Sequence, residues 1–348
     1  MATDGDGLQL RSASFLNYFY RQLTYKPVPV RDVDLTGKTA IVTGSNSGVG
    51  FETARQLLEL GLSKLILAVR DEDKGEAAAA KLTTDLRLTE KRIEVWKLDM
   101  SVYESITAFV ERAERDLDRL DIVILNVGMW SPIKRVFNQH TGHDEVIQVN
   151  YISTALLSIL LLPVVAKSKA EDGPLPRITF NLSEVAAFTS FKEKERIPLL
   201  SGLGTPGNVD PTDRMFVSKL LGQFFVRKLA SIVPPSIAVI NSVSPGAVHS
   251  TGFNREFEKT FKGSMVVRVQ RLMANSPEVG ARMIVDAAVN HGKETHGQFL
   301  SFQSATAMAP IISTEEGREI SERLWEETMA EFSFVGAREI LDRITTES

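Results

Sequence analysis

The stretch from Thr43 to Gly50 reads TGSNSGVG and decides the fold class. It ends the apolar, β-branched run 39–43, which is typical of a buried strand, and it opens a helical pattern over 49–60. The glycines leave room for an anion at the helix N-terminus, where free N–H groups and the helix dipole attract negative charge. Strand, glycine turn and helix together predict a binding site for the pyrophosphate of a dinucleotide.

The chain on either side of this stretch keeps the same rhythm of short β-branched runs and longer helical patterns. This alternation predicts an α/β fold, a doubly wound Rossmann-type parallel sheet of about seven strands with helices on both faces. The expected strands are 39–43, 64–69, 93–98, 122–126, 177–182, 237–243 and 298–302. The expected helices lie around 49–60, 73–86, 104–118, 144–167, 213–231 and 276–290, with a C-terminal helix near 314–343.

The absence of an internal linker predicts one nucleotide-binding catalytic domain over 37–348, preceded by an N-terminal arm over 1–36. The arm contains the aromatic-rich SFLNYFYRQL, which we expect to pack on the body of the protein. The segments 184–212 and 250–275 break the alternation. Long loops in compact domains are usually functional, so we expect lid-like insertions here, with a surface loop of no special role as the alternative.

Composition narrows the classes of partner. The 348 residues carry a net charge of −4 and no basic run, so nucleic acid is not an expected partner, whereas a small molecule is. The chain has no cysteine, which excludes disulfides and thiolate chemistry, and no metal site is predicted. The first ten residues lack a signal pattern, so a cytoplasmic location is expected. The apolar run 155–166 is too short for a bilayer span and predicts a buried helix without stable membrane insertion.

Arg70 ends the second expected strand, about twenty residues after the glycines, where an acidic residue would bind the ribose hydroxyls of NAD. A guanidinium at this place binds a 2′-phosphate in a bidentate manner, which favours NADP(H). The alternative is an ordinary surface arginine with Asp71 beside it.

Further motifs follow the glycine turn in a fixed order. They are LDM (98–100), LNVG (125–128), VNY (149–151), FNLSE (180–184), SK ending at Lys219 and SPGAV (244–248). Over roughly 37–300 the chain therefore resembles the short-chain dehydrogenase/reductase family, above all fungal members associated with secondary-metabolite clusters. The resemblance implies an NADP(H)-dependent oxidoreductase that acts on a small molecule, and the apolar residues Met129, Trp130, Phe188 and Phe253 suggest a bulky apolar one.

The resemblance also implies which residues contact the cofactor. They are Gly44, Ser45, Asn46, Ser47, Gly48, Val49, Gly50, Arg70, Asp99, Met100, Asn126, Val127, Gly128, Lys219, Pro245, Gly246, Val248 and Ser250. Asp99 would contact the adenine, and Val248 would meet the nicotinamide carboxamide. Val127 stands where the family usually has alanine.

Four positions correspond to the catalytic residues of the family; three of them match the pattern and one departs from it. Ser183 would polarise the substrate carbonyl, Lys219 would hold the ribose and Asn150 would anchor a relay water. The family's proton-donating tyrosine precedes the lysine by four residues, and Met215 stands there. Methionine has no proton to donate. General acid–base catalysis contributes roughly 10²–10⁴-fold, so ordinary ketone reduction should be badly impaired.

Other side chains are weaker candidates for the missing donor. Tyr151 is expected to point elsewhere, whereas Glu184 qualifies if burial raises its pKa rather than leaving it solvated. The remaining candidates are His249 and Ser250, which follow the Pro-Gly turn, and His140 and His143, for which capping or solvent exposure is the plainer expectation.

Three functions therefore stay open. The preferred one is an NADP(H)-dependent oxidoreductase with an atypical proton donor. The alternatives are a non-redox enzyme on the same fold, such as a dehydratase, isomerase or cyclase, and a catalytically inactive binding protein. The resemblance further implies homodimers or homotetramers paired through helices 104–118 and 144–167, although a helix buried within one subunit would have the same sequence.

Overall fold

The computed structural model describes residues 15–168, 174–205, 209–249 and 274–346. Its centre is one eight-stranded sheet in the order β3-β2-β1-β4-β5-β6-β7-β8. The strands are β1 (Thr39–Thr43), β2 (Lys64–Val69), β3 (Ile93–Lys97), β4 (Ile122–Leu125), β5 (Arg177–Asn181), β6 (Val239–Ser244), β7 (Phe299–Ser301) and β8 (Ser304–Thr306). All neighbours pair in parallel except β7 and β8. The predicted doubly wound parallel sheet is confirmed.

The antiparallel strand β8 was not expected from the sequence. It has only three residues, two of them exposed. The turn before it is made by Phe302 and Gln303, at φ 49° and 57°, without any glycine. Because non-glycine residues rarely adopt positive φ, neither the strand nor its turn carries a recognisable sequence signal.

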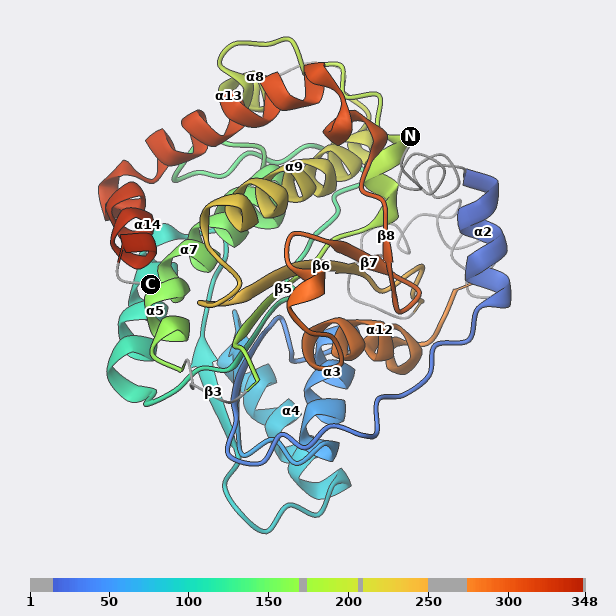
Figure 1. Cartoon of the computed structure of the whole chain (residues 1–348), viewed down its shortest axis with the longest axis vertical. Coiled ribbons are helices and arrows are strands. Elements are labelled where there is room, and N and C mark those ends of the chain that lie inside the picture. Colours follow the sequence, from blue (N-terminus) through green and yellow to red (C-terminus); the bar gives the residue numbers. More distant parts are fainter. Residues whose placement is uncertain (1–14, 169–173, 206–208, 250–273, 347–348) are drawn as a thin grey trace.

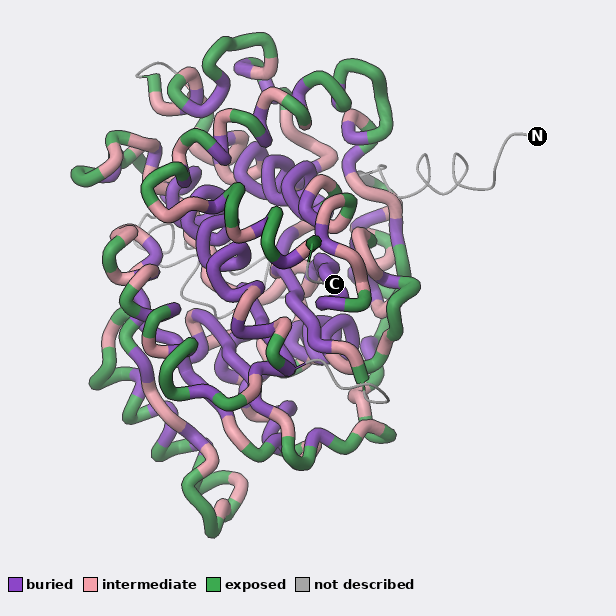
Figure 2. The backbone as a smooth tube through the Cα atoms, turned by 60° about the vertical axis from the view of Figure 1, so that its left-hand side comes forward, coloured by how far each residue is buried: buried purple, intermediate pink, exposed green. Residues whose placement is uncertain are grey.

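Helices cover both faces of the sheet (Figure 1). The helices α3 (Gly48–Glu59), α4 (Glu72–Asp85) and α12 (Pro277–Val289) contribute to one apolar core. The helices α5 (Tyr103–Asp116), α7 (Ser153–Ala166) and α9 (Pro211–Ile232) contribute to the other. Figure 2 shows the buried residues gathered in the interior of the molecule and the exposed residues along its outer segments. Short turns complete the described elements: η4 (Lys293–Thr295), η5 (Pro310–Ser313) and η6 (Ser333–Val335).

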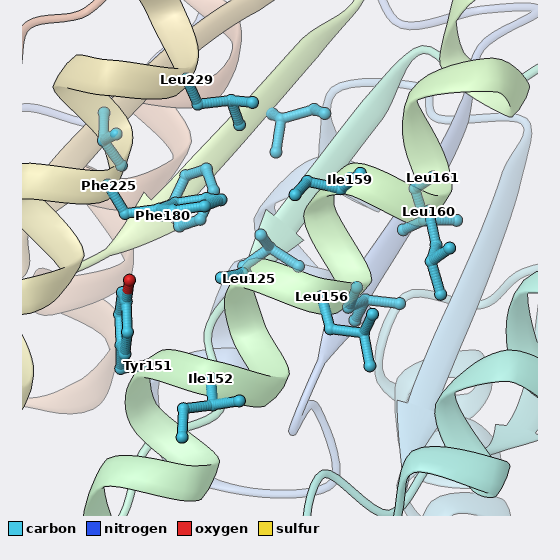
Figure 3. Close-up of a cluster of buried hydrophobic side chains, with 14 of the residues drawn as sticks. Leu125, Tyr151, Ile152, Leu156, Ile159, Leu160, Leu161, Phe180, Phe225 and Leu229 are labelled. Atoms are coloured by element: carbon cyan, nitrogen blue, oxygen red, sulfur yellow. The ribbon is translucent and has the colours of Figure 1, made fainter. Parts of the chain in front are cut away.

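The helix expected over 144–167 is interrupted near its start. It consists of α6 (Glu145–Ile147), the π-helical turn η1 (Gln148–Ile152) and α7. Among the described residues one helical stretch, Glu145–Ala166, is apolar and long enough to cross a membrane by length and composition, and 89% of its apolar window is buried inside the protein. Figure 3 shows its side chains packed against those of β5 and α9. The prediction of a buried helix is confirmed.

The C-terminal helix near 314–343 is two helices, α13 (Glu315–Glu331) and α14 (Ala337–Thr346). The chain turns between them at Gly336, whose φ of 65° ends the preceding helical turn. Leu341 and Ile344 of α14 are buried in the core that contains α7. The apolar surface of α7 is therefore covered within the subunit.

The segment expected to form a lid contains two short helices, η2 (Glu184–Phe188) and α8 (Leu199–Gly204). The first residues of α8 donate backbone hydrogen bonds to the carboxylate of Glu327 in α13. Glu193 forms a buried ion pair of 2.6 Å with Arg214 of α9. These contacts hold the segment between α9 and α13. The other expected insertion lies mostly outside the described residues.

The described part of the N-terminal arm begins with the helix α2 (Phe15–Thr24). Its Tyr18 is buried and packs edge-on against Phe188, and it also contacts Phe302. The expectation that this aromatic segment packs on the body of the protein is confirmed.

Candidate active site

The glycine turn between β1 and α3 has the shape that its sequence requires. Gly44 and Gly48 have φ of 65° and 59°, values that residues with a Cβ rarely adopt. A Cβ on Gly50 would lie 2.5 Å from the carbonyl oxygen of Gly44, so the turn itself excludes a larger residue there, whether or not a pyrophosphate is bound. The N-cap residue Ser47 makes no side-chain cap, which leaves the first N–H groups of α3 to an anion.

Asn126, at the end of β4, fastens the glycine turn to the neighbouring strands. Its Nδ2 donates to the carbonyl oxygen of Thr43 at 2.9 Å, and its backbone N–H donates to the Thr43 hydroxyl at 2.8 Å. Its Oδ1 accepts a hydrogen bond of 3.0 Å from Asn181 of β5. The side chain thus steadies the middle of the sheet. Val127 packs against the same turn: a Cβ added to Gly44 would lie only 3.0 Å from Cγ2 of Val127.

Arg70 and Asp71 follow β2 and differ in what they contact. Asp71 is the N-cap of α4, accepting from the backbone N–H of Lys74, and it also pairs with the Lys74 amine. These hydrogen bonds hold the pKa of the Asp71 carboxyl below its ordinary value. Arg70 is exposed and forms no ion pair with the residues that the structure describes. The guanidinium is therefore the group of this pair that is open to a ligand.

Three other predicted cofactor residues serve local structure as well. The carboxylate of Asp99 accepts hydrogen bonds from the backbone N–H and the hydroxyl of Ser101. Met100 is buried in the core beneath α5. Ser45 is buried and donates to the carbonyl oxygen of Val42 at 2.8 Å.

One face of α9 meets the carboxyl end of β5. Lys219 Nζ donates to the carbonyl oxygen of Asn181 at 2.8 Å, and one turn later Gln223 Nε2 contacts the carbonyl oxygen of Ser183 at 3.4 Å. Met215 lies four residues before Lys219 in the same helix, and therefore on this face. Ser183 lies two residues after the end of β5 and caps η2, its hydroxyl accepting from the backbone N–H of Val185.

The Lys219 amine is buried, and burial lowers its pKa to about 8. Burial disfavours the charged form because the low-dielectric interior replaces water. Near neutral pH this amine is still mostly protonated but gives up its proton more readily than an ordinary lysine, and lowered pKa values of this kind are common at reaction sites.

Asn150 lies in the π-helical turn η1 and joins three elements. Its Oδ1 accepts from the backbone N–H of Met129 at 2.7 Å, and its Nδ2 donates to the Met129 carbonyl oxygen and to the hydroxyl of Ser218, both at 2.9 Å. Ser218 in turn donates to the carbonyl oxygen of Met215. π-Helical turns often mark functional sites. Here the turn directs an asparagine towards α9.

All five tyrosines lie in the described part of the chain, and no hydrogen bond joins any of them to Lys219. Tyr151 is buried in the core and shares a hydrogen bond of 2.6 Å with Thr328 of α13. Tyr103 bonds Glu331, Tyr25 bonds Gln303, Tyr18 packs on Phe188, and Tyr20 is exposed. The prediction that Tyr151 points elsewhere is confirmed.

Glu184 is buried rather than solvated, with only 4% of its surface exposed. Burial raises the pKa of its carboxyl to about 7, and the guanidinium of Arg21, 3.7 Å away, opposes that rise. A carboxylic acid that is half neutral near pH 7 therefore stands next to Ser183. Its charged partner comes from the N-terminal helix, which sequence alone did not indicate.

The loop after β6 turns at Gly246, with φ of 69°. Beyond it, Val248 forms a parallel bridge with Asn275 through the backbone of its two neighbours, Ala247 and His249. The N–H and C=O of Val248 itself make no hydrogen bond with the residues that the structure describes. Ser250 and Phe253 lie outside those residues.

The other histidines that the sequence singled out lie away from this loop. His140 is exposed, as expected. His143 is only partly exposed, and its Nε2 lies 3.1 Å from the carboxylate of Glu331 in α13.

A cavity of about 450 Å³ opens beside the start of α9. Its walls come from the segment that follows η2 and from the first turns of the helix, and they mix the rings of Phe188 and Phe216 with charged side chains. The charged residues are Lys192, Glu193, Arg196, Asp210 and Asp213. The volume falls within the range of small-molecule sites. Of the expected apolar lining, Phe188 takes part, whereas Met129 and Trp130 do not line this cavity.

Sequence reasoning missed Asn181, Ser218 and Gln223. Ser218 and Gln223 are buried and Asn181 is partly buried, and each bonds to a predicted catalytic residue or to its neighbour. The only signal was a polar residue inside an otherwise apolar run, in FNLSE, MFVSK and LLGQFF.

Comparisons with known proteins agree on the fold. Residues 38–174 match the short chain dehydrogenase family. The structure resembles the NADP complex of RhlG from Pseudomonas aeruginosa, with a TM-score of 0.59 and 20% identity over 78% of this chain and 98% of that one. It also resembles a short chain dehydrogenase from Shigella flexneri, with a TM-score of 0.58 and 19% identity over 80% and 94% of the two chains.

Closer relatives come from fungi. The chain is 43% identical to the short-chain dehydrogenase fogG of Aspergillus ruber over 99% of its own length and 100% of that protein. It is 41% identical to the short chain dehydrogenase/reductase mfmJ of Annulohypoxylon moriforme, with 94% of each chain covered. Since such identity extends over almost the whole sequence, this protein belongs to the short-chain dehydrogenase/reductase family of oxidoreductases.

Proposed function

We propose that this protein is an NADP(H)-dependent oxidoreductase that reduces a bulky small molecule of fungal secondary metabolism without a tyrosine proton donor. One observation carries the proposal. The polar chain from the glycine turn through Asn126 and Asn181 to Lys219 is complete. Among the four expected catalytic positions, only Met215, one turn before the lysine, departs from the family pattern.

The residues present fit a dinucleotide phosphate. The uncapped start of α3 suits the pyrophosphate, and the exposed guanidinium of Arg70 suits a 2′-phosphate. The N–H and C=O of Val248 suit a carboxamide, which carries the complementary donor and acceptor. When bound, the nicotinamide supplies the hydride.

The residues of this chain would then hold the substrate rather than protonate it. The hydroxyl of Ser183 donates to the substrate oxygen, and the protonated amine of Lys219 stabilises negative charge near it. An enone suits such a site. Hydride adds to its β-carbon, the electron pair moves to the oxygen as an enolate, and water later protonates the α-carbon, so no side-chain acid has to lie beside the oxygen. An imine suits it as well, because its nitrogen binds a proton before the hydride arrives.

The substrate pocket is assigned to the cavity beside α9. Phe188 and Phe216 supply apolar contact, and the charged residues around them suit a substrate that also carries polar groups. We place the enzyme in the cytoplasm. Pairing into homodimers or homotetramers through α7 would require displacement of α14, which covers that helix here.

A non-redox reaction is the second candidate, and the absence of a phenol beside Lys219 favours it. The two candidates are separated by incubation with NADPH deuterated at the hydride position and a panel of aromatic enones, imines and ketones. We expect cofactor oxidation with deuterium in the product for enones or imines, and loss of turnover in Lys219→Met. Product formation without cofactor oxidation would establish the non-redox function. Binding without any product would leave a binding protein and refute both enzymatic functions.

A further inference from the structure

The N-terminal helix α2 lies across the carboxyl ends of three strands, where ligands bind in open α/β sheets. Its Tyr18 contacts Phe188, which follows β5, and its Arg21 donates to the carbonyl oxygen of Ser301 at the end of β7. Arg21 also covers the ring of Phe302 at 4.5 Å. The helix therefore covers the edge of the sheet that holds Ser183.

Gln22 of this helix forms a pair of hydrogen bonds with a single residue of the loop after β6. The backbone N–H of Ala247 donates to Gln22 Oε1 at 2.9 Å, and Gln22 Nε2 donates to the Ala247 carbonyl oxygen at 3.1 Å. The side chain is only 4% exposed, so water does not compete for these bonds. A Cβ on Gly246 would lie 2.6 Å from Gln22 Oε1, which shows how closely the helix approaches this loop.

The pairing fixes the peptide group next to Val248. Ala247 is held by Gln22 from one side and by Asn275, whose backbone N–H donates to the Ala247 carbonyl oxygen, from another. The backbone of Val248 is thereby held in place, while its own N–H and C=O form no hydrogen bond with the described residues. A second amide pair holds the other end of the arm: the backbone N–H of Val28 donates to Gln303 Oε1, and Gln303 Nε2 donates to the Val28 carbonyl oxygen.

We propose that Gln22 is a positioning residue for the nicotinamide half of the cofactor, and that the N-terminal arm is a part of the active site. The proposal rests on the proposed function, because it requires that the loop after β6 meets the nicotinamide. Gln22 acts through Ala247 and does not touch the cofactor. A carboxamide that pairs with Val248 binds tightly only if the backbone is already held in place, since ordering a free loop costs conformational entropy.

The test measures the Kd of two ligands for the full-length protein. NADPH carries the nicotinamide, whereas adenosine 2′,5′-bisphosphate carries only the adenosine half. We expect Gln22→Ala and Gln22→Glu to weaken NADPH binding about tenfold, the equivalent of one or two hydrogen bonds, and to leave bisphosphate binding unchanged. Gln22→Glu keeps the acceptor of Gln22 but loses the donor to Ala247.

Gln303→Ala is the matched control, because it removes a similar amide pair at the other end of the arm. It should lower the melting temperature as Gln22→Ala does and leave NADPH affinity intact. If both Gln22 variants bind NADPH as tightly as the wild type, the proposal is overturned while the proposed function still stands. The same holds if Gln303→Ala loses as much NADPH affinity as the Gln22 variants do. A wild-type protein that binds neither ligand would refute the proposed function and this inference with it. Retained bisphosphate binding shows that each variant is folded.

Discussion

Lys219 Nζ lies 2.8 Å from the carbonyl oxygen of Asn181, and this hydrogen bond joins the helix α9 to the end of β5. The side chain of Asn181 continues the connection to Asn126, which holds the glycine turn. The phosphate end and the reactive end of the proposed cofactor site are thus connected by side chains that are themselves hydrogen-bonded. Rigid support of this kind keeps catalytic groups in place before the substrate arrives.

Replacement of Asn126 should disturb both ends of this chain. Asn126→Ala removes the donor to Thr43 and leaves the amide of Asn181 without its acceptor, so we expect a loss of about 2–3 kcal/mol in the free energy of unfolding, together with weaker NADPH binding. Urea unfolding and a binding titration measure the two effects. Asn290→Ala, which removes a single part-buried hydrogen bond to Asp286, is the control and should cost only about 1 kcal/mol. Equal losses in the two variants would contradict the assignment.

Met215→Tyr should raise the rate of ketone reduction, because it places a phenol one turn before the buried amine of Lys219. A proton donor in this place contributes roughly 10²–10⁴-fold. Steady-state rates with NADPH and aromatic ketones measure the gain. Met215→Phe supplies the ring without the hydroxyl and should show none. If the tyrosine variant folds, binds NADPH and stays as slow as the phenylalanine variant, the pocket does not present a carbonyl at this position.

Arg70 should decide between the two nicotinamide dinucleotides. Arg70→Ala removes the charge-assisted contact to the 2′-phosphate that we propose, so the Kd for NADPH should rise roughly 10- to 100-fold while the Kd for NADH stays the same. Arg115→Ala, at an exposed arginine of α5, should change neither value. Equal effects of Arg70→Ala on both cofactors would show that the guanidinium does not contact the phosphate.

Glu184 should make stability depend on pH in a direction opposite to that of an ordinary carboxylate. Its folded pKa of about 7 lies above the ordinary value of 4.5, so the folded state holds a proton that the unfolded state loses between these two values. The free energy of unfolding should therefore fall across this window as pH rises, by roughly 3 kcal/mol from this group alone. Glu184→Gln removes that fall.

The measurement for Glu184 is urea unfolding of both proteins at pH 5 and pH 8. The free energy of unfolding of Glu184→Gln, relative to that of the wild type, should be higher at pH 8 than at pH 5. A difference between the two proteins that does not change with pH would show that Glu184 titrates as a solvated carboxylate. Glu316→Gln, at the start of α13, is a control in which an accessible carboxylate is changed in the same way.

The sheet and most of its helices were predictable because their signals are local. A β-branched run, a glycine turn and an apolar period each act within a few residues, and the bounds of β1 and β2 agree with expectation. The break at Gly336 lies within one helical pattern that continues on both sides, so the sequence suggested a single helix. The strand β8 was not predicted for a related reason, since its turn is formed by Phe302 and Gln303, neither of which is a residue type typical of turns.

The sequence by itself determined the cofactor fold, the order of the motifs and the presence of Met215 one helical turn before Lys219, because these depend on residue type and short-range spacing. The tertiary structure alone decided that Glu184 is buried beside Arg21, and that no tyrosine is hydrogen-bonded to Lys219. It also placed Gln22 against Ala247, 225 positions away in the chain. Burial and such distant contacts arise only when the layers pack together, and no local pattern encodes them.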